Sequence, residues 1–148
     1  MGTQYSGTAC EVRALDAYVK LMRAAESVTT RSHRHLNTVN LTVSQFGVLE
    51  ALFHKGPLSQ RDLAEKLLKS GGNITMVIDN LEKRQLVKRE RSVEDRRFVS
   101  VCLTEEGKQL ISKIFPLHVA VVMEEMSILT EAEQEELSRL CRRLGKKE

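Results

Sequence analysis

Most of this chain alternates apolar and polar residues with the period of an α-helix. Val12, Leu15 and Val19 recur every three or four residues, which predicts a long amphipathic helix from about residue 10 toward residue 36. Further apolar stripes at helical spacing follow at Phe46–Phe53, Leu63–Leu68, Ile74–Leu81, Leu110–Met126 and Leu137–Leu144. The first predicted helix is too long to be buried by a domain this small on its own.

Polar and turn residues mark where these helices begin and end. Thr42–Gln45 and Thr130–Glu133 match the capping box, in which a hydroxyl caps the first turn and the third residue after it reaches back. Ser59 and Thr104 offer hydroxyl caps to two other helices. The pair Gly56-Pro57 is typical of a helix end.

The period changes in the centre of the chain. Leu86–Arg91 and Phe98–Leu103 are rich in alternating or β-branched residues, which predicts two short strands joined by the polar loop Ser92–Arg97. Upstream, Lys69–Gly72 carries the paired glycines of a tight turn, and a helix restarts at Asn73. Two short helices followed by a hairpin form a winged helix-turn-helix pattern. We therefore predict a mainly α (α+β) fold, with this pattern between long terminal helices.

The second helix of that pair has a polar face opposite its apolar stripe. Amides and hydroxyls hydrogen-bond to base edges, methionine packs on thymine methyl groups, and glycines let a phosphate approach the start of a helix. Asp79 lies on the same face, where it would accept from a cytosine amine or pair with Lys83. The candidate DNA-binding residues of this helix are Gly71, Gly72, Asn73, Thr75, Met76, Asn80, Lys83 and Arg84.

Positive charge is concentrated directly after this helix. Residues 83–97 include seven basic and three acidic side chains, whereas the whole chain has a net charge of only +3. A basic hairpin beside a polar helix predicts contact with a phosphate backbone. A merely solvated, charged hairpin is the alternative interpretation. The candidate DNA-binding residues of the hairpin are Lys88, Arg89, Arg91, Asp95, Arg96 and Arg97.

Composition and motifs argue against several other classes of protein. A chain of 148 residues, 41% hydrophobic and 29% charged, is ordinary for one globular domain. Its apolar runs are shorter than the roughly 18–20 residues that span a bilayer, and its polar N-terminus differs from a secretion signal. The sequence has neither a nucleotide-binding glycine loop nor a Ser/His/Asp order, so we predict no enzyme and no cofactor.

Cysteines and histidines give little support to a metal site. The three cysteines are far apart and form no C-x-x-C pair, which suits a reducing cytoplasm better than a disulfide framework. His33 and His35 fall on different sides of a helix, and His54 and His118 are isolated in the sequence. We therefore predict that no metal is bound.

Four motifs of this sequence resemble the MarR family of bacterial transcription regulators. They are Leu41–Phe46, Leu81–Val87, Glu94–Arg97 and Leu103–Gly107. The resemblance extends over roughly residues 15–144, and Asp-x-Arg followed by Leu-Thr-Glu-x-Gly is its most specific part. It implies one domain over 1–148, with a DNA-binding lobe at about 42–103. It also implies a symmetric homodimer, paired through helices at about 10–40 and 104–145.

The resemblance also implies roles for the hairpin. The arginine at its tip, Arg97, enters the minor groove of double-stranded DNA, and Asp95 holds it in position. A narrow A·T-rich groove concentrates negative potential and attracts a guanidinium group. The remaining basic side chains of the hairpin, together with Lys83 and Arg84, are predicted to contact phosphates.

The family commonly responds to small aromatic or phenolic compounds, metals or oxidants. One branch senses peroxides through a cysteine early in the first helix, but that position falls near Tyr18 here. Cys10, about two turns earlier, remains a candidate sensor of electrophiles such as quinones. Cys102 lies between Val101 and Leu103 in a predicted strand, and Cys141 lies on the apolar stripe of the last predicted helix. We therefore expect both cysteines to be buried.

These inferences predict a cytoplasmic, homodimeric repressor that binds a pseudo-palindromic operator and is released by a phenolic, quinone-like or oxidative signal. The alternative is a winged-helix module for protein–protein assembly, in which the same basic hairpin binds an acidic partner.

Overall fold

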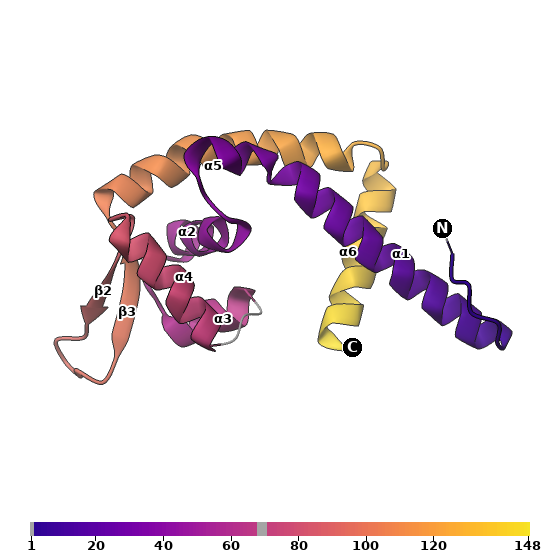
Figure 1. The fold of residues 1–148 in the computed structure, drawn as a ribbon, viewed down its shortest axis with the longest axis horizontal. Coiled ribbons are helices and arrows are strands. Elements are labelled where there is room, and N and C mark those ends of the chain that lie inside the picture. Colours follow the sequence, from indigo (N-terminus) through magenta and orange to yellow (C-terminus); the bar gives the residue numbers. More distant parts are fainter. Residues whose placement is uncertain (1, 68–70) are drawn as a thin grey trace. The chain divides into compact units, whose positions relative to one another are not determined.

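A computed structural model of the chain describes residues 2–67 and 71–148 (Figure 1). In chain order the elements are α1 (Ala9–Ser32), the 3₁₀-helix η1 (Arg34–Val39), α2 (Val43–Lys55), β1 (Leu58–Ser59), α3 (Gln60–Leu67), α4 (Gly71–Lys83), β2 (Val87–Arg91), β3 (Val99–Leu103), α5 (Glu105–Met126) and α6 (Glu131–Lys146). This order confirms the predicted fold class, a helical chain that carries a winged helix-turn-helix.

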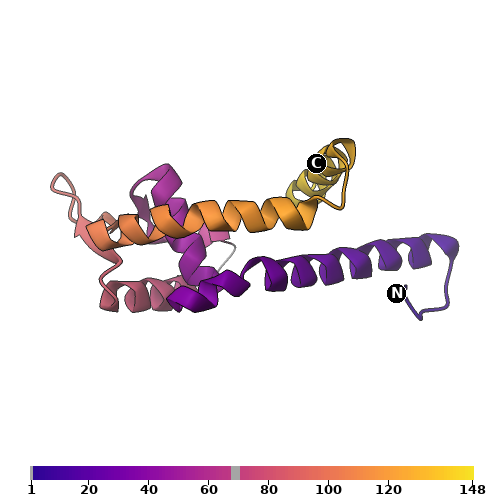
Figure 2. The same ribbon diagram turned by 90° about the horizontal axis from the view of Figure 1, so that it is seen from above.

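The chain divides into two compact units. The central unit comprises residues 35–119, and the terminal unit comprises the described residues up to 34 together with 120–148. Helix α5 is a single unbroken helix, with Pro116 inside it, and belongs to both units (Figure 2).

The hydrophobic core lies in the central unit. Every buried apolar side chain of the described residues belongs to it. Helix α2 is apolar on most of its sides, as expected of a helix enclosed by others, and buries Phe46, Val48, Leu49, Ala51 and Leu52. Helix α4 adds one face only, through Ile74, Ile78 and Leu81, which leaves its opposite face available for other contacts.

A three-stranded antiparallel sheet in the order β1-β3-β2 completes the central unit. Val101 in the middle strand pairs with Leu58 on one side and with Arg89 on the other, and its side chain is fully buried. Strand β1 was missed by the sequence analysis because two residues are too few to show a period.

The Leu-Thr-Glu-x-Gly motif, Leu103–Gly107, connects the start of α5 to the segment between α4 and β2. The Thr104 hydroxyl donates to the Gln85 carbonyl oxygen at 2.6 Å and accepts from the Gly107 N–H at 3.0 Å. The Thr104 N–H donates to the Leu86 carbonyl oxygen at 3.1 Å. A Cβ atom on Gly107 would overlap that same oxygen, so only glycine lets α5 approach β2 this closely. The motif is therefore explained by packing.

The predicted caps of α2, α3 and α6 are confirmed. Thr42 with Gln45, and Thr130 with Glu133, form complete capping boxes. The Ser59 hydroxyl accepts from the Asp62 N–H at 3.0 Å. These bonds satisfy amide donors that the first turn of a helix leaves without partners.

Several boundaries differ from the prediction. Helix α1 starts at Ala9 under a third capping box, Thr8 with Glu11, which the sequence analysis overlooked. It also ends at Ser32, where the polar Thr29–Ser32 stretch gives way to η1. Helix α4 begins at Gly71, so the paired glycines form its first turn and do not precede it. The rest of the predicted turn, together with Leu68, lies outside the described residues.

The terminal unit has no comparable core. It contains α1, the end of α5 and α6, and an ion pair joins Arg31 Nε to Glu125 Oε2 at 2.9 Å. Among its described residues only Ser32 is buried, and α6 buries none. The expected burial of Cys141 is accordingly wrong for the single chain, in which this cysteine is exposed.

Candidate nucleic-acid interface

Helix α4 presents the polar face that the sequence predicts. The buried Ile74, Ile78 and Leu81 hold one side of the helix against the core. Met76 is 63% exposed on the opposite face and is available for apolar contact with a partner. All eight residues proposed for this helix segment are exposed: Gly71, Gly72, Asn73, Thr75, Met76, Asn80, Lys83 and Arg84.

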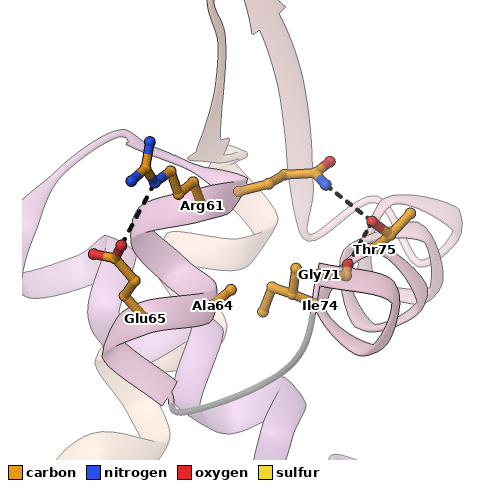
Figure 3. Close-up of a pocket in the computed structure, with 7 residues that line it drawn as sticks. Arg61, Ala64, Glu65, Gly71, Ile74 and Thr75 are labelled. Atoms are coloured by element: carbon orange, nitrogen blue, oxygen red, sulfur yellow. Dashed lines mark hydrogen bonds and ion pairs between the residues drawn. The ribbon is translucent and has the colours of Figure 1, made fainter.

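The start of α4 borders a groove against α3 (Figure 3). Gln60 also lines this groove, and its Nε2 donates to the Thr75 hydroxyl at 3.1 Å. That hydroxyl donates in turn to the Gly71 carbonyl oxygen at 2.9 Å. Because its proton is used inside the helix, Thr75 offers a partner its methyl group and an acceptor oxygen.

The two glycines of this first turn are not required by packing. A Cβ atom on Gly71 or Gly72 would meet no atom within 4 Å, and neither residue has a positive φ. Their free space lies outside the protein, at the end of a helix where amide donors and the dipole favour an anion. This is consistent with the predicted approach of a phosphate.

Two arginines of the predicted interface already have partners within the central unit. Arg84 donates to the carbonyl oxygens of Asn40 at 2.7 Å and Val39 at 3.0 Å, which fastens the end of α4 to η1 and the residue after it. Arg89 binds Asp79 of α4, so the pairing of Asp79 with Lys83 that we considered is replaced by a cross-element ion pair. Neither contact could be predicted from the sequence, since both join residues of different elements.

The tip of the hairpin holds Arg97 through Asp95. Arg97 Nη2 lies 2.8 Å from Asp95 Oδ2 and Nε lies 3.0 Å from Oδ1, while the Arg97 N–H donates to the same oxygen at 3.0 Å. These bonds lower the pKa of the Asp95 carboxyl, and the carboxylate raises the pKa of Arg97. The Arg97 side chain nevertheless remains 87% exposed. Asp95 therefore orients the Arg97 side chain, which remains accessible to a partner.

The loop around this pair is closed by backbone bonds. The Ser92 N–H donates to the Phe98 carbonyl oxygen at 2.9 Å, and the Phe98 N–H donates to the Asp95 carbonyl oxygen at 3.1 Å. Arg91 Nη1 donates to the carbonyl oxygen of Arg96 at 2.7 Å. Phe98 itself is 67% exposed, an apolar surface beside Arg97 that the sequence analysis did not single out.

The remaining basic residues of the hairpin are exposed. Lys88 Nζ forms an ion pair with Glu90 Oε1 at 2.9 Å, which raises the pKa of Lys88 and lowers that of Glu90. The Arg96 side chain makes no hydrogen bond or ion pair with the residues that the structure describes. The structure thus places all the predicted hairpin residues on one hairpin, whose strand β2 packs against α4, and Arg96 is the least engaged of them.

The cysteines fall in different surroundings. Cys10 is exposed in the first turn of α1. Cys102 is half-buried, its Sγ donates to the Lys88 carbonyl oxygen at 3.7 Å, and burial raises the pKa of its thiol. A raised pKa disfavours the thiolate, so Cys102 is a poor nucleophile.

Histidines that are distant in the sequence meet in the central unit. The ring centroids of His35 and His118 lie 5.2 Å apart, and His118 lies 4.6 Å from Phe46. His54 packs against Phe115 at 4.7 Å. In the described ranges, no three residues among His, Cys, Asp and Glu are grouped so as to hold a metal ion. No helix of residues 2–67 and 71–148 has the length and hydrophobicity to cross a membrane.

Comparison with known proteins adds three findings. A protein-family model described as the MarR family matches residues 41–99. The HTH-type transcriptional regulator MhqR of Bacillus subtilis is 35% identical over 90% of this chain and 92% of its own length. Among solved structures, Bordetella bronchiseptica BpsR, whose DNA binding is regulated by 6-hydroxynicotinic acid, is 26% identical, with a TM-score of 0.79 over 87% of this chain and 98% of its own.

A further solved structure shares the fold. Sco3205 of Streptomyces coelicolor, a MarR family transcriptional regulator in complex with DNA, has a TM-score of 0.84 over 97% of this chain and 91% of its own, at 22% identity.

Proposed function

Because the chain belongs to the MarR family of HTH-type transcriptional regulators, we propose that it is a homodimeric repressor that binds a pseudo-palindromic operator. Members of this family are DNA-binding proteins and not enzymes. The proposed place of action is the cytoplasm, because that compartment holds the operator.

One observation carries the DNA-binding part of the proposal. The exposed polar face of α4 and the oriented, accessible Arg97 belong to the same compact unit, which buries the core of the chain. In our proposal α4 enters the major groove, where Asn73, Thr75 and Asn80 meet base edges. Arg97 enters the adjacent minor groove, and Lys83, Lys88, Arg91 and Arg96 contact phosphates.

The dimer is proposed from the exposed apolar residues of the terminal helices. Leu137, Leu140 and Leu144 form the stripe of α6, and all three are exposed in the single chain. Met22 of α1 is 50% exposed and Met123 of α5 is 68% exposed. Exposed apolar residues along helices that bury almost nothing in the single chain support an interface, so we assign residues 10–40 and 104–145 to dimerisation and 42–103 to DNA binding.

The geometry of B-DNA constrains such a dimer. Two symmetry-related copies of α4 must lie about 34 Å apart, one helical repeat, to enter successive major grooves on one side of the duplex. A protein that covers a duplex in this way blocks access to a promoter, which is why we propose repression over activation. The two halves of the operator are then related by the same twofold symmetry as the protein.

Release from DNA is proposed to follow the binding of a small phenolic or quinone-like compound. A dimer whose two α4 helices are not about 34 Å apart cannot enter successive major grooves. A ligand with a higher affinity for that dimer than for the DNA-binding one shifts the population away from the DNA-binding state. The regulation of BpsR by a hydroxylated aromatic acid supports this class of ligand. Modification of the exposed Cys10 by an electrophile or oxidant is the second proposed route.

The experiment is fluorescence anisotropy of a labelled duplex from the region upstream of the gene, with a scrambled duplex of equal length as control. We expect the protein to bind the upstream duplex more tightly than the scrambled one. The logarithm of its affinity should fall linearly with the logarithm of the salt concentration. Equal, weak binding of both duplexes would lead to a random-sequence selection, and failure of that selection would favour the protein–protein assembly module. Adding phenols and quinones to the bound complex then tests release, with a Cys10→Ser variant to separate ligand binding from thiol modification.

A further inference from the structure

We propose that Arg89 is a positioning residue that acts through Asp79 and Glu82. It holds these two carboxylates of α4 in ion pairs and thereby keeps them from repelling the operator. This inference rests on the DNA-binding function proposed above, and it gives Arg89 a role other than the direct phosphate contact expected from the sequence.

The geometry around Arg89 joins three elements of the central unit. Its Nη2 lies 2.7 Å from Asp79 Oδ1, and its Nη1 lies 2.9 Å from Glu82 Oε1, both on α4. Its backbone N–H donates to Glu82 Oε2 at 3.2 Å, so both oxygens of Glu82 are engaged. Its Nε donates to Gln60 Oε1 of α3 at 2.8 Å. All three nitrogens of the guanidinium are therefore used within the protein.

The two carboxylates stand where negative charge works against DNA binding. Asp79 is on the exposed face of α4 with Met76 and Asn80, and Glu82 is one turn further along the helix. Their side chains are 50% and 43% exposed, whereas that of Arg89 is 24% exposed. A phosphate backbone carries a dense negative charge, so unpaired carboxylates at this place would weaken binding to every sequence.

No other cation among the described residues pairs with these carboxylates. Arg84, directly after the helix, donates to the backbone carbonyl oxygens of Val39 and Asn40. Lys83 forms no ion pair within the described part of the chain. The group of Arg89, Asp79 and Glu82 therefore has a net charge of −1, which becomes −2 when Arg89 is removed.

The same guanidinium also affects Thr75. Gln60 accepts from Arg89 through its oxygen and donates to the Thr75 hydroxyl through its nitrogen. Arg89 thus orients Thr75, a residue of the exposed face of α4, indirectly through Gln60. An Arg89→Lys variant keeps the positive charge and loses most of this hydrogen-bond geometry, so it separates the effect of charge from that of orientation.

Rescue by charge removal tests the proposal. The variants are Arg89→Leu, Asp79→Asn/Glu82→Gln, and the triple variant that combines all three changes. Affinities for the selected operator and for a scrambled duplex are measured across a salt series by anisotropy, and urea unfolding of each variant is measured alongside. Arg91→Leu, alone and combined with Asp79→Asn/Glu82→Gln, is the matched control, because Arg91 lies on the same strand and donates to a carbonyl oxygen.

We expect Arg89→Leu to weaken binding to both duplexes by about tenfold or more at low salt, with a smaller effect at high salt. The triple variant should recover at least the wild-type affinity, since its group is neutral whereas that of the wild type has a charge of −1, and the same carboxylate changes in Arg91→Leu measure how much of that recovery is a general effect of removing negative charge. Arg89→Lys should bind within about threefold of the wild type.

The proposal would be overturned in favour of a direct phosphate contact by the following result. The triple variant binds DNA as weakly as Arg89→Leu, and the slope of its log affinity against log salt concentration is smaller than that of the wild type by about 0.9. If Arg89→Leu fails to fold, Arg89→Lys decides: a loss of operator affinity as large as that of Arg91→Leu would also overturn the proposal. A wild-type protein that selects no duplex at all would instead refute the proposed DNA-binding function.

Discussion

The two units of this protein differ in how their apolar residues are covered. The central unit buries Phe46, Leu49, Leu63 and Ile78 to 2% exposure or less, together with every other buried apolar residue of the described chain. The terminal unit leaves Leu144 61% exposed and Met123 68% exposed. Both units contain regular helices with complete capping boxes, so the local structure of the helices does not account for the difference.

This difference indicates what each unit needs in order to be stable. A helix gains most of its stability from packing of its apolar face, and short isolated helices are marginal in water. The central unit provides that packing from its own sequence. The terminal unit buries almost none of its apolar side chains in the single chain, and in the proposed dimer a second copy of the chain covers them. Four predictions test this contrast.

The largest effect is expected from a charge in the proposed interface. Leu140→Glu would bury a carboxylate among the apolar residues of two chains, and the dissociation constant of the dimer should rise by at least about a hundredfold. Sedimentation equilibrium measures this change. Arg142→Glu places the same group on the opposite side of α6 and should leave the dimer intact. Two variants with equal dissociation constants would argue against an interface along this stripe.

Gly107→Ala should disrupt the central unit. Its Cβ would overlap the Leu86 carbonyl oxygen, and relief requires α5 to move away from β2, at a cost of about 3 kcal/mol. Urea unfolding at a fixed dimer concentration measures this loss. Gly72→Ala is the control, because its Cβ meets nothing within 4 Å and alanine favours a helix. If Gly72→Ala weakens operator binding without a change in unfolding, it also supports the phosphate approach proposed for this turn.

Arg97→Ala should separate DNA binding from folding. Removal of the exposed guanidinium is expected to weaken operator binding by about tenfold to a hundredfold, because its minor-groove contact is lost. Thermal unfolding and the dimer constant should hardly change, since the side chain is 87% exposed. Arg96→Ala, one residue earlier, should produce a smaller loss that is equal for operator and scrambled duplexes. An equal loss of folding in Arg97→Ala would contradict the assignment of this residue.

The smallest effect compares two equivalent caps. Thr42→Ala and Thr130→Ala each remove a hydroxyl that accepts from the third amide of a helix, a loss of about 1 kcal/mol. In α2 this should lower the free energy of unfolding of the central unit. In α6 it should appear as a dimer dissociation constant about thirtyfold higher, because α6 depends on its partner and both copies lose a cap, about 2 kcal/mol per dimer. Unchanged dimerisation in Thr130→Ala would indicate that α6 is formed in the monomer.

The sequence allowed most of the fold to be predicted because its signals are local. Apolar periodicity located the α-helices and the two long strands, and Thr42–Gln45 and Thr130–Glu133 marked helix starts correctly. Where a signal was short or absent, the prediction failed. Strand β1 has two residues, and the Thr8–Glu11 box lies in a polar segment that showed no apolar stripe.

The sequence allowed us to predict which residues α4 and the hairpin expose, but not which contacts those residues make. The pairing of Asp95 with Arg97 was expected from the family resemblance, and the structure contains it. Arg84 and Arg89 were placed among the phosphate contacts because a positive charge in a basic segment has no visible partner in sequence. Their partners Asn40, Asp79 and Glu82 come from other elements.

The sequence by itself determined the helices, the hairpin, the polar face of α4 and the excess of positive charge after it. Each of these depends on residues within a few positions of one another, so no knowledge of the fold is needed. Only the tertiary structure decided which charges are paired, where His35 and His118 meet, and which apolar stripes remain uncovered. Those properties depend on distances between segments far apart in the chain, which the fold sets and a local pattern does not contain.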